Sequence, residues 1–309
     1  MNSIQILATG SYLPTQKIEN ATLNERFNLQ EGWIEKRTGI QTRYLTSEET
    51  PVDMAVKAVE NLLKNTKLNK QEIDMIVVAS TSSKYIMPSI SFFVQKKLEI
   101  SECICMDVLA GCSGYINAFD IVRNYITLGK IQYGIVLGVE ELSSFTDQDD
   151  INTAILLSDG AGATLLGKSE KEKKYDSLIE SQGQFGEILT CTIDEKIKMN
   201  GREIYKYASS KTVENITKLL KKNQMRIEDI TYMIPHQSNT RILKTMGEKL
   251  NLNPSKIYLN VSEVGNTFCA SIPIALDEMF QKQLLKEGDK IILLGYGGGL
   301  NLGSIVMEV

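Results

Sequence analysis

DVLAGCSGYINAFDIV, residues 107–122, joins the end of a short apolar strand to a helix that is apolar on nearly every side. A helix of that composition is buried between other layers of a protein. Gly111 and Gly114 flank the turn at Cys112 and would let another backbone come close to it. This stretch predicts an α/β protein with the helix start at its centre.

Strands and helices alternate on both sides of this stretch. An unbroken apolar run over residues 73–81 is typical of a buried parallel strand. The sequence predicts further strands over 103–109, 133–139 and 154–166, and helices over 89–98 and 114–128. This βαβαβ order indicates helices that cover sheets. The charged segment 167–175 is the place to divide the chain, into an N-terminal half (1–170) and a C-terminal half (171–309).

The two halves repeat one pattern. In the first half, a strand, a helix and a second strand lead to Cys112 at a helix start. In the second half the same order leads from the strand before His236, through a strand expected over 256–265, to Asn266. Matching helix starts in two pseudo-symmetric halves can face each other. The duplication therefore predicts that Cys112, His236 and Asn266 come together.

Cys112 is the candidate nucleophile. The unpaired N–H groups and the positive end of the dipole at a helix start should lower the pKa of its thiol, and its own N–H could stabilise an oxyanion. The alternative is a cysteine that serves as a small buried hydrophobe. That alternative suits the remaining cysteines better, namely Cys103, Cys105, Cys191 and Cys269. The total of five cysteines is odd and no CxxC motif occurs, which argues against a disulfide framework or a zinc site.

His236 and Asn266 are the other candidates for the site. His236 is the only histidine of the chain and follows Pro235 at the carboxyl end of a predicted strand, where α/β proteins place their clefts. Asn266 precedes an apolar helix. A hydrogen-bonded structural histidine and a plain helix cap are the alternatives, and local sequence leaves both open.

Composition narrows the class of protein. With 309 residues, 42% of them hydrophobic, the chain can build a sizeable core. A net charge of −4 argues against a nucleic-acid binder, and no apolar run approaches the ~18–20 residues of a membrane helix. The N-terminus lacks the features of a signal peptide, so we expect a cytoplasmic protein.

Six motifs, in this order and spacing, resemble the ketoacyl synthase III family. They are GWIEKRTGIQTR (32–43), DVLAGCSGY (107–115), SDGAGA (158–163), IPHQSNTRI (234–242), GNTFCASIPIAL (265–276) and GYGGGLNLGS (295–304). The resemblance implies a thiolase fold of two pseudo-symmetric halves in αβαβα layers. It also implies a homodimer with a Cys-His-Asn site that condenses an acyl-CoA primer with malonyl-[acyl carrier protein], without a metal or an organic cofactor.

The resemblance assigns a role to each matching residue. Cys112 would accept the acyl group, while His236 and Asn266 would bind the thioester carbonyl of the malonyl group. Gly298 would add a second backbone donor to the oxyanion hole, and Asn239 would lie close to the triad. The remaining matches are Met87 on the wall of the acyl pocket, Trp33 and Arg37 at the adenine of CoA, and Arg241, Lys244 and Lys249 at the acidic carrier protein.

Three positions depart from the family pattern. Ile151 replaces a frequent arginine that stacks on adenine, Glu248 replaces a lysine used in docking, and Arg202 replaces an asparagine near the CoA tunnel. Ile151 and Glu248 favour an alternative task on the same fold, that of a starter-unit enzyme of a secondary pathway with a non-acetyl primer. The length and branching of the primer, and whether CoA or a carrier protein delivers it, stay open at this point.

Other assignments fit the residues less well. An HMG-CoA synthase needs a glutamate acid, and a thiolase needs a second catalytic cysteine at a position that Cys269 does not match. A non-catalytic scaffold would not need the triad together with both glycine clusters.

Cys112→Ala should abolish both the covalent acyl adduct and condensation, because the adduct forms on this thiol. Intact-protein mass spectrometry after incubation with acyl-CoAs, followed by peptide mapping, measures the adduct. An acyl group found on Cys191 or Cys269 would contradict the assignment.

Overall fold

The computed structural model describes residues 3–309; Met1 and Asn2, which fall in the predicted N-terminal half, lie outside them. The first half builds a mixed sheet with the strand order β1-β7-β6-β4-β5. Its strands are β1 (Ser3–Tyr12), β4 (Met75–Ala79), β5 (Ile104–Val108), β6 (Tyr133–Glu140) and β7 (Gly160–Ser169). β4 runs parallel to β5 and β6, whereas β7 runs antiparallel to β1 and β6.

The second half repeats this sheet with one edge strand fewer. The strand order is β11-β12-β13-β8, formed by β8 (Tyr175–Ser181), β11 (Tyr232–Pro235), β12 (Lys290–Gly297) and β13 (Asn301–Glu308). β11 is parallel to β12, and β13 is antiparallel to both of its neighbours, as in the first sheet. The strands β1, β7, β6 and β4 thus correspond to β8, β13, β12 and β11. The predicted pair of pseudo-symmetric halves is confirmed.

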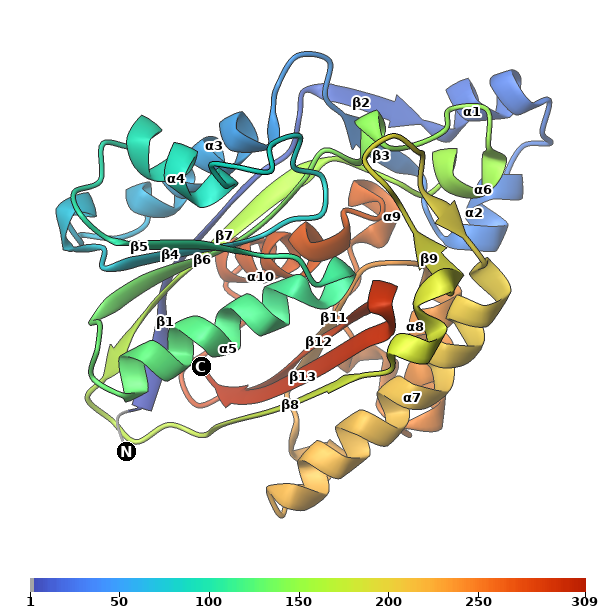
Figure 1. Ribbon diagram of the computed structural model, residues 1–309. Helices are drawn as coiled ribbons and strands as arrows, with labels where there is room; N and C mark the ends of the chain where they lie inside the picture. Colours follow the sequence, from blue (N-terminus) through green and yellow to red (C-terminus); the bar gives the residue numbers. More distant parts are fainter. Residues whose placement is uncertain (1–2) are drawn as a thin grey trace.

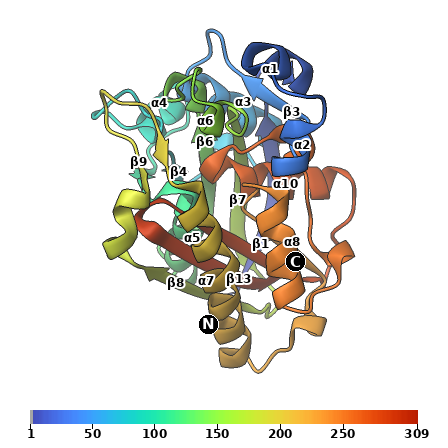
Figure 2. The same ribbon diagram turned by 90° about the vertical axis from the view of Figure 1, so that its right-hand side faces the viewer.

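Helices cover both sheets and fill the space between them (Figure 1). α5 (Gly114–Thr127) and α10 (Ser271–Gln281) lie in the middle, where one apolar cluster combines residues of both halves, among them Phe119, Ile234 and Ile305. α3 (Pro51–Lys64) and α4 (Ile90–Lys97) pack on the outer face of the first sheet. α7 (Gly201–Lys222) and α8 (Thr240–Lys249) cover the second sheet and face the viewer in Figure 2. These are the predicted αβαβα layers.

Shorter elements gather at one side of the molecule (Figure 1). They are β2 (Gln16–Glu19), β3 (Thr42–Leu45), α1 (Asn20–Phe27), α2 (Trp33–Thr38), α6 (Ile151–Ala154), α9 (Val261–Val264), β9 (Leu189–Thr190) and β10 (Lys198–Met199), together with short 3-10 turns. Within residues 3–309, no helix has the length and apolar character that a membrane crossing requires.

Two predicted strands differ from the structure. The strand expected over 154–166 begins only at Gly160, because the side chain of Asp150 caps the backbone at Asn152 and starts the short helix α6. The strand expected over 256–265 is reduced to a single bridge between Met233 and Ile257. Beyond that bridge the side chain of Gln237 accepts the backbone N–H groups of 260 and 261, which a neighbouring strand would otherwise bind.

Gly162→Ala should lower the free energy of unfolding. A Cβ at Gly162 would lie 2.7 Å from the backbone nitrogen of Ile274 on α10, which leaves no space for a methyl group. Overpacking of this kind typically costs about 1–3 kcal/mol. Urea unfolding measures the change. Gly183→Ala is the matched control, because a Cβ there meets nothing within 4 Å; equal effects of both substitutions would contradict the steric reason.

Candidate active site

Cys112 lies in a tight turn between a strand and the central helix. β5 ends at Val108, a 3-10 turn covers Gly111–Ser113, and α5 begins at Gly114. Gly111 has φ +56°, a left-handed conformation that glycine adopts without strain. The turn places Cys112 in the interior, with only 3% of its surface exposed.

The end of β12 passes directly against this cysteine. A Cβ at Gly297 would lie 2.6 Å from the Cβ of Cys112, so only glycine allows the approach. The approach brings the backbone N–H of Gly298 to the sulfur, where it forms a hydrogen bond together with the N–H of Cys112 itself. The two backbone donors that the sequence predicts for an oxyanion hole thus meet at the thiol.

His236 follows β11 and is fixed on several sides. Its backbone N–H donates to the carbonyl of Leu294 (2.7 Å), and its ring nitrogen Nδ1 lies 2.7 Å from Ser271 Oγ at the start of α10. The ring packs edge-on against Tyr296, with 5.2 Å between ring centroids. Burial lowers the pKa of His236 to about 3, against a hydrogen bond with the Phe268 backbone that raises it. The imidazole is therefore neutral at physiological pH.

Asn266 is held from the first half of the chain. Its backbone N–H donates to the carbonyl of Leu156 (2.9 Å), and its own carbonyl accepts the N–H of Ser158 (3.0 Å). The side-chain oxygen accepts the N–H of Phe268 (3.1 Å), the first residue of the 3-10 turn Phe268–Ala270 that precedes α10.

Phe268 connects the three candidate residues. Its backbone forms hydrogen bonds with His236 and with Asn266, and its side chain packs with Cys112 in one buried apolar cluster. The structure therefore brings together Cys112, His236, Asn266 and the N–H of Gly298, from both halves of the chain.

The protonation state of Cys112 differs from the expectation. Burial raises the pKa of its thiol, and the nearby carboxylate of Glu140 raises it further, whereas the N–H groups of Gly298 and Cys112 lower it. The lowered pKa that a helix start predicts is outweighed by burial. Without substrate, Cys112 is therefore a thiol at neutral pH.

Three residues behind the triad were not predicted from the sequence. Ser271 orients His236, Phe268 links the triad, and Glu140 lies fully buried at the end of β6. Glu140 accepts hydrogen bonds from Thr81 and from the thiol of Cys269 (3.0 Å). A carboxylate at the end of an otherwise apolar strand was the one available signal for Glu140.

Trp33, Arg37 and Asn239 lie together at the edge of α2. The guanidinium of Arg37 stacks over the Trp33 ring, 4.0 Å from its centroid, and Ile151 belongs to the same apolar cluster as Trp33. Asn239 caps α8 by accepting the N–H of Arg241 (2.8 Å), and its amide donates to the Arg37 carbonyl (3.3 Å). The hydrogen bonds of Asn239 thus join α8 to α2.

Four predicted contact residues lie on the surface. Met87 is 80% exposed, on the loop between β4 and α4, and is not part of the apolar cluster at Cys112. Arg241, Lys244 and Lys249 are exposed on α8, where Lys249 Nζ donates to the Ser209 carbonyl of α7 (2.9 Å). Glu248 is exposed on the same helix.

This fold and this site define a class of protein. Two stacked βαβαβ halves, with a buried cysteine at a central helix start that Phe268 links to a neutral histidine and an asparagine, are the features of a thiolase-fold condensing enzyme. Family models agree. Residues 106–183 match the model described as 3-oxoacyl-[acyl-carrier-protein] synthase III, and residues 220–309 match the model of its C-terminal part.

Whole-chain relatives give the same result. The chain is 36% identical to the β-ketoacyl-[acyl-carrier-protein] synthase III of Clostridium acetobutylicum, over 100% of this chain and 99% of that relative. It superposes on the 3-oxoacyl-[acyl-carrier-protein] synthase III of Aquifex aeolicus with a TM-score of 0.96 at 35% identity, covering 99% of this chain and 100% of that one. The Thermus thermophilus structure gives 0.94 at 31%, covering 98% of each chain.

The chain belongs to the 3-oxoacyl-[acyl-carrier-protein] synthase III family and is an acyltransferase of the condensing type. The alternative of a starter-unit enzyme of a secondary pathway is not favoured. A priming β-ketosynthase of a polyketide pathway also superposes, with a TM-score of 0.94, but at 24% identity that likeness shows the fold alone.

His236 should stay neutral from pH 5 to 8, because burial lowers its pKa to about 3. It is the only histidine, so ¹⁵N-histidine labelling gives a single pair of imidazole nitrogen signals whose shifts report the charge. The unfolded chain binds a proton near pH 6.5, whereas the native site does not. The free energy of unfolding is therefore independent of the protonation of this histidine above that pH, and it declines as the pH falls from 6.5 towards 3. A titration midpoint near 6.5 in the native protein would contradict the burial argument.

Proposed function

We propose that the chain catalyses the decarboxylative condensation of an acyl-CoA primer with malonyl-[acyl carrier protein], the reaction that initiates fatty acid biosynthesis. The product is 3-oxoacyl-[acyl carrier protein]. The observation that carries this proposal is the buried thiol of Cys112, with two backbone N–H groups at its sulfur and a neutral His236 in the same site. Neither a metal nor an organic cofactor is part of the proposal.

The first step is acyl transfer to the enzyme. The sulfur of Cys112 attacks the thioester carbonyl of the primer. The N–H groups of Cys112 and Gly298 donate hydrogen bonds to the carbonyl oxygen and stabilise the negative charge that develops on it. The C–S bond to CoA then breaks, and CoA leaves with the proton that the thiol of Cys112 gives up. Because that thiol is protonated at rest, the incoming thioester and the two donors must favour its ionisation.

The second step is the condensation. Loss of CO₂ from the malonyl group leaves an enolate, whose negative charge rests on the thioester oxygen. His236 and Asn266 are neutral donors for this charge. The hydroxyl of Ser271 accepts the N–H of Gln237 (3.3 Å) and so presents its proton to Nδ1 of His236, which leaves the Nε2–H as the donor. The enolate carbon attacks the acyl carbonyl and releases the sulfur of Cys112.

A second copy of the chain is the proposed partner at the β5 edge. β5 is an edge strand, and exposed apolar side chains surround it, namely Tyr85, Ile86, Met87, Phe92, Ile104 and Leu109. An open edge with such a patch favours pairing with another strand, and a two-fold axis through β5 would satisfy both copies. Met87 would then be buried at the seam, where it could form part of an acyl pocket.

The two ends of the substrates have separate proposed contacts. The stacked pair of Trp33 and Arg37 offers a flat cationic surface to the adenine of CoA. Arg241, Lys244 and Lys249 offer positive charge to an acidic carrier protein, with Glu248 opposing them. We propose that the enzyme works in the cytoplasm, without nucleic-acid or membrane partners.

His236→Ala and Asn266→Ala should each slow decarboxylation by about 10²–10³, the usual loss for one oxyanion donor. Both variants should still take up the acyl group on Cys112, because the enolate forms only in the second step. Release of ¹⁴CO₂ from labelled malonyl-[acyl carrier protein] and mass spectrometry of the acyl-enzyme separate the two steps. A His236→Ala variant that condenses at wild-type speed would overturn the proposed role.

A further inference from the structure

The apolar side chains around Cys112 would form the walls of a pocket for an acyl group on its sulfur, and they are held in two ways. The apolar cluster around Cys112 consists of Leu142, Phe145, Leu156, Leu157, Leu189, Ile197 and Phe268. Leu156, Leu157 and Phe268 are held by the backbone bonds around Asn266. Leu142 and Phe145 instead belong to or follow the 3-10 turn Leu142–Ser144, and Ile197 belongs to the β9–β10 hairpin, which pairs with neither main sheet. The position of these walls therefore depends on local contacts.

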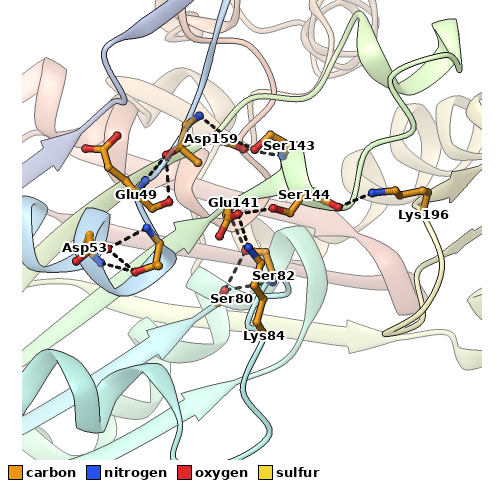
Figure 3. Close-up of polar contacts among 12 residues, drawn as sticks. Glu49, Asp53, Ser80, Ser82, Lys84, Glu141, Ser143, Ser144, Asp159 and Lys196 are labelled. Carbon is orange, nitrogen blue, oxygen red and sulfur yellow. Dashed lines mark hydrogen bonds and ion pairs between the residues drawn. The ribbon is translucent and has the colours of Figure 1, made fainter.

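Those local contacts are polar and centre on Glu141 (Figure 3). The Oε1 atom of Glu141 accepts hydrogen bonds from Lys84 Nζ (2.8 Å) and from the hydroxyl of Ser144. On the other side, Lys196 Nζ donates to the Ser144 carbonyl (2.7 Å), and the N–H of Ile197 donates to the Phe145 carbonyl (2.8 Å). Asp159 holds the same turn from its other side, where it accepts the N–H (2.8 Å) and the hydroxyl of Ser143. The carboxylates of Glu141 and Asp159 together thus fix the turn that contacts the hairpin, and Glu141 is the one that holds Ser144.

Glu141 also joins this turn to the loop after β4. Its backbone N–H donates to Ser82 Oγ (2.8 Å), and its partner Lys84 lies on the same loop. Glu141 therefore attaches the turn with Leu142 to the loop after β4. The carbonyls of Ser144 and Phe145 attach the same turn to the hairpin.

The ion pair of Glu141 with Lys84 contributes little to the stability of the fold. Glu141 is only 5% exposed, and its Oε2 atom is buried without a hydrogen-bond partner among the described residues. Lys84 has a side chain that is 54% exposed, so the ion pair is only half desolvated. A buried carboxylate with one unpaired oxygen offsets much of what its ion pair contributes, and its main effect is to fix geometry.

We propose that Glu141 is a positioning residue that selects the primer: by holding the turn Leu142–Ser144 and, through it, the hairpin at Ile197, it limits the length of acyl chain that fits beside Cys112. The proposal rests on the proposed function in that the group on Cys112 is an acyl chain. Without Glu141, Ser144 loses its anchor while Ser143 stays bound to Asp159, so Ser144 and the hairpin that contacts its carbonyl can shift outward and the pocket admits longer chains.

The test compares chain lengths in two assays. The first measures the rate at which N-alkylmaleimides with ethyl, butyl and octyl chains modify Cys112, followed by mass spectrometry of its peptide. This assay needs no enzymatic activity. The second measures self-acylation by acetyl-, butyryl-, hexanoyl- and octanoyl-CoA. The variants are Glu141→Ala, which removes the carboxylate, and Lys84→Met, which removes only its exposed partner. Glu195→Gln is the control, because it removes an exposed carboxylate paired with Lys198 on the same hairpin.

In Glu141→Ala the ratio of long-chain to short-chain rates should rise by about ten-fold or more in both assays, since one methylene in an apolar pocket changes the rate by ~10–200-fold. Lys84→Met should shift the ratio in the same direction by less, and it carries the test if Glu141→Ala does not fold. Glu195→Gln should leave the ratio unchanged.

The outcomes separate the two proposals. Ratios that stay at the wild-type value in Lys84→Met and in folded Glu141→Ala, even with a lowered melting temperature, would overturn the role of Glu141. A shifted maleimide ratio in an enzyme that no acyl-CoA acylates would support the positioning role and refute the proposed primer instead.

Discussion

The structure depends on one close contact between its halves, that of Gly297 in the second half with Cys112 in the first. A methyl group at position 297 would lie 2.6 Å from the Cβ of Cys112, so the backbone at Gly297 can come this close only because it carries no side chain. Only at that distance does the N–H of Gly298 reach the sulfur. The contact in turn requires that both sheets pack on α5 and α10 without a gap, which explains why one apolar cluster draws residues from both halves. The large buried core thus sets the geometry of a few polar atoms.

Burial at this contact decides which chemistry the site can perform. A charged imidazole or a free thiolate would be costly there, so His236 is neutral and Cys112 is a thiol. Neutral donors suit a reaction whose intermediates carry negative charge, because they stabilise an oxyanion without first forming an ion pair with the nucleophile. A negative charge on the buried carboxyl of Glu140 would also disfavour the thiolate of Cys112, and burial raises the pKa of Glu140 itself.

Much of this could be predicted from the sequence, and the failures have physical causes. The repeated pattern of strand, helix and glycine-flanked turn was enough to place Cys112 near His236 and Asn266. Periodicity failed where a side chain takes over backbone hydrogen bonds, as Gln237 does beside Val261. The pKa of Cys112 was expected in the wrong direction because a helix start is visible in sequence, whereas complete burial is a property of the packed fold. Met87 is exposed in the single chain, and its predicted place on the wall of the acyl pocket stays a prediction.

Residues that perform chemistry and residues that shape the pocket are anchored differently in this molecule. Cys112, His236 and Gly298 lie at the ends of strands in the two main sheets, where a shift would disturb the whole core. The turn Leu142–Ser144 is attached by side-chain hydrogen bonds to Glu141 and Asp159, and the β9–β10 hairpin contacts the turn through Lys196. Such bonds can be changed one at a time at small cost to the fold. Sequence alone could not reveal this division, because Glu140 and Glu141 are adjacent and chemically identical. Only the fold directs Glu140 towards Cys269 and Glu141 towards the pocket wall.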